Sequence, residues 1–89
     1  MSGYGNNEVD FTGIATVKQF HERIRQGMQV PEYYGDNLDA LYDVLSGMNG
    51  RVVFRGVENV DEDMVGYMNR FMTMCADAKS NPLVEIVMA

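Results

Sequence analysis

Residues 31–45 read PEYYGDNLDALYDVL, and this stretch is the most informative part of the chain. Asn37 is a favourable N-cap residue and predicts a helix that runs from there to about Ser46. When the residues are placed at about 100° intervals around that helix, its polar and apolar side chains separate sharply. The face that we expect to pack into a core consists of Leu38, Leu41, Leu45 and one side of Tyr42.

A second face of the same helix carries Asp39 and Asp43 at positions i and i+4. Like charges at this spacing cost an isolated helix a few tenths of a kcal/mol. No Lys or Arg lies within residues 31–45 to offset that cost, and Asp36 would point the same way if the preceding turn is helical. Local conflicts of this kind tend to mark functional sites, although most acidic helix faces are only solvated surface.

Two tyrosines, Tyr33 and Tyr34, come shortly before the acidic face. Tyrosine supplies a rigid contact area with a polar tip, and aromatic anchors among acidic groups resemble the centre of a protein–protein interface. The pattern alone therefore supports an acidic binding face and a surface that only keeps the domain soluble equally well.

The segment before this stretch predicts another helix. Thr16 and Gln19 have the spacing of a capping box, and apolar residues then recur every three or four positions. Gly27 and Pro31 mark where that helix must end.

The segment after it predicts two strands with a helix between them. Acidic residues at positions 61–63 suit a helix N-terminus, and Asn81-Pro82 stops the helix. Its broad apolar face carries Met64, Tyr67, Met68, Phe71, Met72, Cys75 and Ala78. Strands are expected at residues 8–11, 52–54 and 83–88, the second of them buried because Val52, Val53 and Phe54 are all apolar.

The expected order of elements is β-α-α-β-α-β. Strands separated by helices favour parallel pairing. We therefore predict an α/β fold with a three-stranded, largely parallel sheet and helices packed on it. A chain of 89 residues suits one domain, which we place at residues 8–89 after a flexible N-terminus of residues 1–7.

The charge balance narrows the class of partner. Thirteen acidic residues against seven basic ones give a net charge of -6. Such a chain is repelled by phosphate backbones and attracts basic proteins, so we expect no direct nucleic-acid binding. Cys75 is the one cysteine, no secretion signal opens the chain, and no apolar run approaches the roughly 20 residues of a membrane span. The expected compartment is the cytoplasm, without membrane contact.

Catalytic chemistry has no good candidate in the sequence. His21 is the one histidine, and because no nucleophile is placed beside it we expect it at the surface or at the core boundary. Cys75 lies on an apolar helix face, where a buried, inert thiol is the usual state. The methionines are interpreted as core filler. No metal-ligand spacing or phosphate-binding glycine loop is present, so we expect neither an enzyme nor a cofactor or metal.

The stretch at residues 31–45 resembles the barstar family, the intracellular inhibitors of barnase-type ribonucleases. The order of elements also agrees with that family along nearly the whole chain, and Asp77-Ala78-Lys79 resembles a Glu-Ala-Lys at the end of its last helix. The matching residues are Pro31, Glu32, Tyr33, Tyr34, Gly35, Asn37, Leu38, Asp39, Ala40, Leu41 and Asp43, with Asp36 in place of the family's usual Glu.

This resemblance implies a one-to-one complex in which an acidic helix blocks the basic active site of a ribonuclease. Tyr33 would be the aromatic contact from the loop, and Asp39 and Asp43 the carboxylates that enter the site, with Asp43 in the place of an RNA phosphate. Both groups present anionic oxygens to Arg and Lys donors. The remaining interface positions that the resemblance implies are Tyr42, where the family usually has Trp, Gly47 and Met48 in the following loop, and the peripheral Asp77.

Some positions depart from the family pattern. Met48 and Asn49 stand where well-known members have a bulky aromatic and an apolar residue, and Gly50 replaces a Glu. The loop contact is therefore smaller and less acidic, and about three residues are missing before the last helix. These differences keep an alternative open, in which the chain is an acidic interaction or regulatory module for a basic partner that is not a nuclease.

Overall fold

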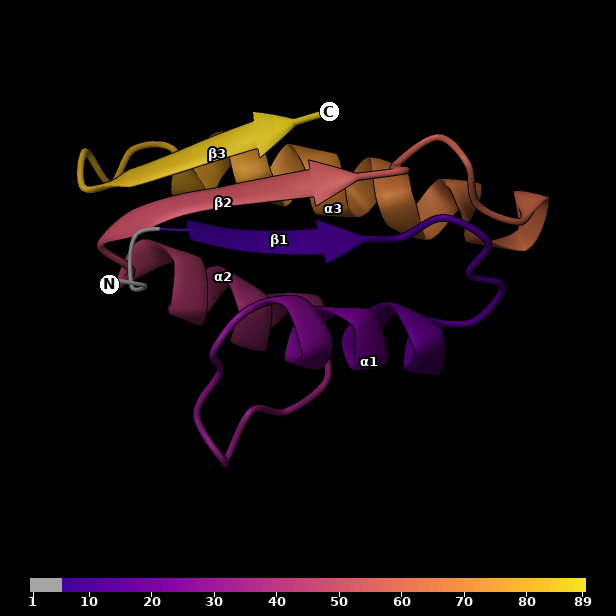
Figure 1. Ribbon diagram of the computed structural model, residues 1–89, viewed down its shortest axis with the longest axis horizontal. Helices are drawn as coiled ribbons and strands as arrows, with labels where there is room; N and C mark the ends of the chain where they lie inside the picture. The colour runs from indigo at the N-terminus through magenta and orange to yellow at the C-terminus, as the bar shows by residue number, and fades with distance from the viewer. Residues whose placement is uncertain (1–5) are drawn as a thin grey trace.

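The computed structural model describes residues 6–89 and contains a three-stranded parallel sheet (Figure 1). The strands are β1 (Asn6–Asp10), β2 (Gly50–Arg55) and β3 (Val84–Met88), in the order β1-β2-β3. The predicted α/β class and parallel pairing are confirmed. β1 begins at Asn6, two residues earlier than expected, because Asn6 and Asn7 are in register with Arg51 and Val52. The rest of the segment predicted to be flexible, residues 1–5, lies outside the described residues.

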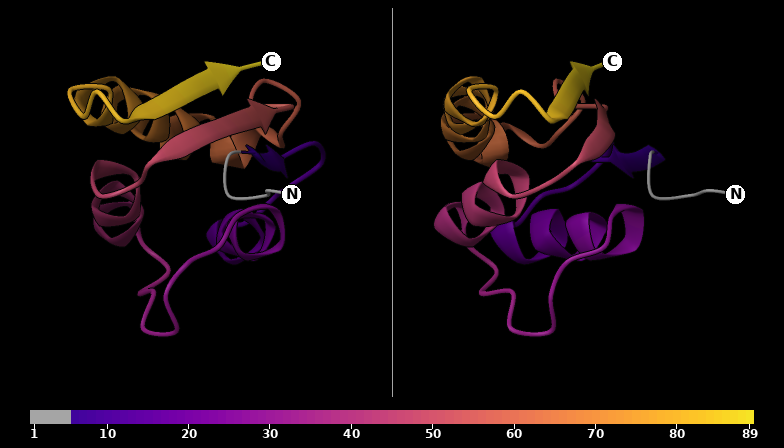
Figure 2. Two further views of the ribbon diagram at one scale, coloured as in Figure 1. Left: turned by 60° about the vertical axis from the view of Figure 1, so that its left-hand side comes forward. Right: turned by 90° about the vertical axis from the view of Figure 1, so that its left-hand side faces the viewer.

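Within residues 6–89, the helices cover only one face of the sheet (Figure 2). Val52 and Phe54 are buried, whereas Val53 between them is half-exposed, so the prediction that all three are buried is wrong for Val53. Figure 2 shows all the helices on one side of the sheet. Charged side chains on the open face pair across the strands, as Arg55 does with Glu8 and Arg51 with Glu85.

Two of the helices begin directly after the capping residues that the sequence predicts, and the last helix follows a capped 3₁₀ turn. The Thr16 hydroxyl accepts from the Gln19 amide at 3.1 Å and starts α1 (Val17–Gly27). The Asn37 side chain accepts from the Ala40 amide at 2.7 Å and starts α2 (Leu38–Ser46). Asp61 caps a short 3₁₀ turn, η2 (Glu62–Met64), which leads into α3 (Val65–Ala78). These side chains satisfy amides that a helix N-terminus leaves free.

The core between the sheet and the helices is built around four phenylalanines. Phe11 stacks on Phe20 with ring centroids 4.6 Å apart, and Phe54 meets Phe71 edge-on at 4.9 Å. Leu41 and Leu45 join this core from α2, as their helical positions predict. The remaining buried residues include three methionines and the thiol predicted to be inert, namely Met28, Met64, Met68 and Cys75.

His21 lies inside the core, and the prediction of a surface or boundary histidine is wrong. Its side chain is 2% exposed. Both ring nitrogens have partners, the hydroxyl of Tyr34 at 2.7 Å and that of Tyr67 at 2.8 Å. Because a buried polar ring is stable only when its nitrogens are hydrogen-bonded, the two tyrosines allow the histidine to be buried.

Gly27 ends α1 at the point where the helix crosses β1. A Cβ atom at this position would collide with the backbone carbonyl of Glu8. The glycine therefore lets the helix approach the strand and fixes where the following loop, residues 28–37, leaves the sheet.

Candidate functional site

The exposed surface of α2 carries two free carboxylates. Asp39 lies in the first turn and Asp43 in the last, and both side chains are exposed. Neither forms a hydrogen bond or ion pair with any residue that the structure describes. Their spacing of four residues places them on the same side of the helix, so their mutual repulsion is not offset by a nearby cation.

Asp36 does not extend this acidic face, because the turn before α2 is not helical, which was the condition of that expectation. Its φ of 52° ends any helical continuation of the turn before α2. Its Oδ1 lies 2.9 Å from Nη2 and 3.1 Å from Nε of Arg25, which comes from α1. The carboxylate is therefore neutralised by the chain's own arginine and is part of the loop structure.

The two tyrosines of the preceding loop point in opposite directions. Tyr33 is 88% exposed, whereas Tyr34 is 5% exposed and belongs to the core. Tyr42, on α2, is 36% exposed. The sequence predicts that one side of this ring packs into the core, and part of the side chain remains open to solvent. Tyr33 and Tyr42 therefore offer aromatic area to a partner, and Tyr34 does not.

Four of the predicted site residues line one groove of about 950 Å³. The groove runs between the C-terminal end of α1 and the loop that follows α2, with Gly27 and Met28 on the α1 side. The predicted residues that it brings together are Tyr33, Asp43, Gly47 and Met48. Asp39 and Tyr42 project from α2 outside the groove lining.

The loop that begins at Gly47 is held by Asn81, which the sequence did not indicate as part of the site. The side-chain amide of Asn81 donates to the carbonyls of Leu45 at 3.2 Å and Met48 at 2.9 Å. In the sequence, Asn81 signals only the end of α3, because its partners are more than thirty positions away. Met48 is half-buried against the core, whereas Gly47 and Asn49 on either side of it are exposed.

Asp77 is exposed near the C-terminal end of α3, one turn before Asn81. It lies on a different element from the other predicted residues and does not line the groove. Any contact with a partner that also covers the groove would therefore be peripheral.

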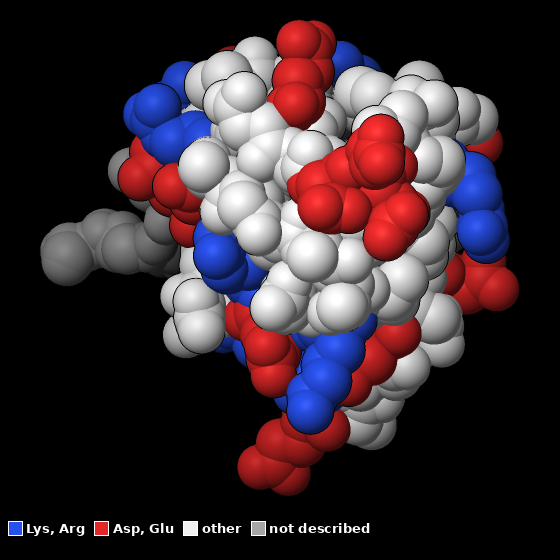
Figure 3. Space-filling view, turned by 90° about the vertical axis from the view of Figure 1, so that its right-hand side faces the viewer, with Lys and Arg blue, Asp and Glu red and all other residues white. Residues whose placement is uncertain are grey.

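A second acidic group lies at the opposite end of the molecule and has a structural explanation. Asp61, Glu62 and Asp63 surround the 3₁₀ turn before α3, where the Asp61 carboxylate accepts from the Asp63 amide at 3.0 Å. Acidic and basic side chains alternate over this end (Figure 3). The acidic residues here stabilise a helix start, in contrast to Asp43, which lies at a helix end.

Among residues 6–89, no group of three or more His, Cys, Asp or Glu side chains is arranged to hold a metal ion. None of the described helices is long and apolar enough to cross a membrane.

Comparison with known proteins agrees with the resemblance at residues 31–45. A family model described as "Barstar (barnase inhibitor)" matches residues 5–85. The chain is also similar to the protein named "Putative ribonuclease inhibitor YrdF" of Bacillus subtilis (strain 168), with 36% identity over 39 residues. That match covers 44% of this chain and 43% of YrdF. From the extent of the family match together with the three-stranded parallel fold, we conclude that the chain belongs to the barstar family.

Proposed function

We propose that this protein inhibits a ribonuclease of the barnase type by forming a one-to-one complex that covers the enzyme's basic active site. The observation that carries the proposal is the pair of exposed carboxylates on α2, Asp39 and Asp43, which have no partner in the described chain. Asp43 also lines the same groove as the exposed Tyr33. Free carboxylates can accept charge-assisted hydrogen bonds from arginine and lysine at no cost of breaking existing pairs.

In this proposal the helix carboxylates take the place of RNA phosphates. Both groups present anionic oxygens to the Arg and Lys side chains that bind RNA. Tyr33 and Tyr42 would pack against the rim of the active site and exclude water, which strengthens the central charge pairs. The protein itself carries out no reaction in this role, since occupation of the site alone prevents RNA from entering.

Asp43 is expected to dominate because it lines the groove together with Tyr33, Gly47 and Met48. A partner loop that enters the groove would therefore contact this carboxylate. Removing one member of a buried charge pair typically costs 2–5 kcal/mol, roughly 30-fold to several-thousand-fold in affinity. Asp39, outside the groove lining, should contribute less.

The test measures RNA cleavage by barnase in the presence of increasing amounts of this protein. The parent should abolish cleavage at a one-to-one ratio, and Asp43→Ala should weaken inhibition by at least about 30-fold. Glu62→Gln is the matched control, because it removes one exposed negative charge at the opposite end of the molecule. It should leave inhibition within about twofold of the parent.

Two results would contradict the proposed mechanism. If Asp43→Ala inhibits as well as the parent, the α2 carboxylate is not the group that occupies the active site. If association with barnase does not slow as the salt concentration rises, charge attraction does not guide the encounter.

A second candidate function is an acidic interaction module for a basic partner without nuclease activity. The observation that favours it is Met48 of the Gly47–Asn49 loop, which packs partly against the protein's own core and so offers less apolar surface to a partner. The two candidates separate when the immobilised protein is used to capture a partner from the native cell and the captured protein is assayed for RNA cleavage. Cleavage that the free inhibitor suppresses supports the ribonuclease target, and a captured basic protein without cleavage supports the module.

A further inference from the structure

The position of Tyr33 depends on how its neighbour Tyr34 is held. The Tyr34 amide donates to the Pro31 carbonyl at 3.0 Å, which closes a tight turn around Tyr33. Within this turn the Tyr33 ring is directed to solvent, and the ring of Tyr34, the next residue, enters the core. Whatever fixes the Tyr34 ring therefore fixes the direction of Tyr33.

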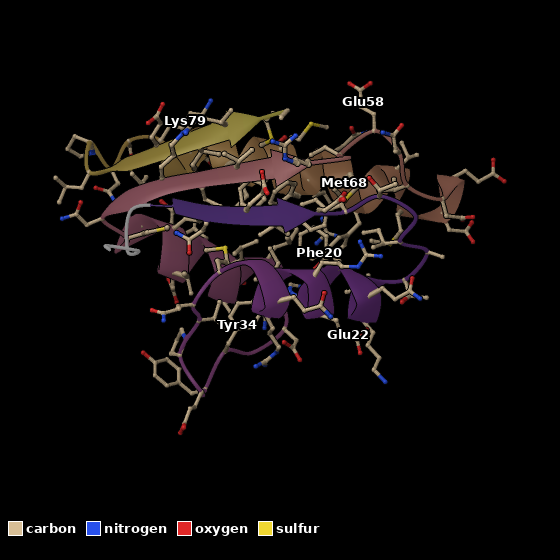
Figure 4. All side chains as sticks on the ribbon, viewed as in Figure 1. Phe20, Glu22, Tyr34, Glu58, Met68 and Lys79 are labelled. Carbon is tan, nitrogen blue, oxygen red and sulfur yellow. The ribbon has the colours of Figure 1, made fainter. Side chains whose placement is uncertain are left out.

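Tyr34, labelled in Figure 4, belongs to the loop before α2. A hydrogen-bonded chain joins it to two helices. The Tyr34 hydroxyl lies 2.7 Å from Nδ1 of His21 on α1, and His21 Nε2 lies 2.8 Å from the hydroxyl of Tyr67 on α3. The rings also pack together, with centroids 5.5 Å apart for His21 and Tyr34. We call these three residues the Tyr34–His21–Tyr67 chain.

The chain has one favourable arrangement of hydrogens. A neutral imidazole has one donor and one acceptor nitrogen. The Tyr34 hydroxyl is buried, so its hydrogen needs a partner inside the protein, and Nδ1 of His21 is the acceptor in reach. Nε2 then carries the hydrogen and donates to Tyr67, which is half-exposed and can turn its own hydroxyl hydrogen to solvent.

Arg25 provides a second attachment of the same loop. It lies one turn after His21 on α1, and its Nη2 donates to the Tyr34 carbonyl at 3.0 Å as well as to Asp36. Its guanidinium also lies over the Tyr34 ring, 5.2 Å from the centroid. The loop is thus fixed at Tyr34 and again directly before Asn37, the cap of α2.

From this geometry we infer that His21, Tyr34 and Tyr67 are positioning residues that hold the Tyr33 loop in its binding arrangement before a partner arrives. The part of this inference that concerns binding rests on the proposed function. A loop that is already ordered loses less conformational freedom on association, so the complex is tighter. If the loop is ordered in only a fraction of the molecules, the apparent affinity falls by that fraction.

The test uses Tyr34→Phe and Tyr67→Phe, each of which removes one hydroxyl and keeps the ring. Two quantities are measured: the hydrogen-exchange rate of the Tyr34 amide in the free protein, and the dissociation constant for barnase. One hydrogen bond corresponds to about threefold to tenfold in an equilibrium constant. Each variant should therefore speed this exchange by about threefold to tenfold. Binding of barnase should weaken by up to the same factor, because the affinity falls with the fraction of molecules whose loop is ordered.

Ile86→Val is the control, because it destabilises the core from β3, a strand that carries no member of the Tyr34–His21–Tyr67 chain. A turn amide exchanges through local opening, so Ile86→Val should leave both quantities unchanged. If the tyrosine variants lower global stability but change neither the exchange rate nor the affinity, the residues are only structural and the inference is wrong. If the parent itself fails to bind barnase, the proposed ribonuclease target is wrong, and the exchange rates still decide whether the chain holds the loop.

Discussion

The two carboxylates of α2 should affect the stability of the free protein in different ways. Asp43 lies in the last turn of a nine-residue helix, where the carbonyl ends carry partial negative charge. Asp39 lies in the first turn, where the amide ends carry partial positive charge. If Asp43 is retained for binding a partner, removing its charge should make the free protein more stable.

The expected magnitude follows from two contributions. Replacing Asp43 by Asn relieves the repulsion with Asp39, worth about 0.2–0.5 kcal/mol. It also removes an unfavourable charge at the helix end, worth about 0.3–1 kcal/mol for an exposed group. Asp43→Asn should therefore raise the free energy of unfolding by about 0.5–1.5 kcal/mol, equivalent to about 2–12 °C in melting temperature for a domain of this size.

Asp39→Asn is the matched comparison. It relieves the same repulsion but loses a favourable interaction of similar size with the helix start. Its free energy of unfolding should stay within about 0.5 kcal/mol of the parent value. The difference between the two variants thus separates the helix-end effect from the repulsion that both of them remove.

Urea denaturation followed by far-UV circular dichroism suits this comparison, since the chain has no tryptophan and urea adds no ions. The measurements are made at about 0.01 M salt and again at about 1 M, where exposed charges are screened beyond roughly 3 Å. The gain from Asp43→Asn should shrink at high salt. A loss of stability at low salt would show that Asp43 makes a stabilising contact within its own chain, which would refute the view of a free binding carboxylate.

Two further predictions concern buried titratable groups. Burial lowers the pKa of His21 below its ordinary value of 6.5, so the unfolded chain takes up a proton that the folded chain binds only at lower pH. The free energy of unfolding should fall as the pH drops below 6.5, and His21→Gln should remove this slope in urea titrations at several pH values. Burial also raises the pKa of the Cys75 thiol to about 12. In native conditions at pH 8 a thiol reagent should therefore leave Cys75 unmodified, with labelling appearing as urea unfolds the protein; rapid native labelling would contradict its burial.

The regular elements could be predicted from the sequence because their signals are local. Thr16 and Asn37 each bond an amide three positions away, so caps and helix starts are readable without tertiary structure. The exposed positions of Asp39 and Asp43 followed from the same helical period. Val53 was misjudged because an apolar run does not reveal whether one or both faces of a strand are covered.

The inner side of the site could not be predicted, since its contacts join distant segments. His21 meets partners thirteen and forty-six positions away, and Arg25 reaches Asp36 across the loop. The positive φ of Asp36 breaks the periodicity on which the prediction of its direction relied. The neighbouring residues Tyr33 and Tyr34 are therefore exposed and buried, respectively. What distinguishes them is that the loop, α1 and α3 pack together around Tyr34.

The α1–loop–α2 segment forms the crossover between β1 and β2, which are neighbours in the sheet. Helices shorter than about 12–15 residues are marginal in isolation, and α2 has nine. A synthetic fragment copying residues 31–47 should consequently be a poor mimic of the intact protein. The binding surface that we propose lies on the segment between these two strands. Loss of the pairing between β1 and β2 would therefore also disorder that surface.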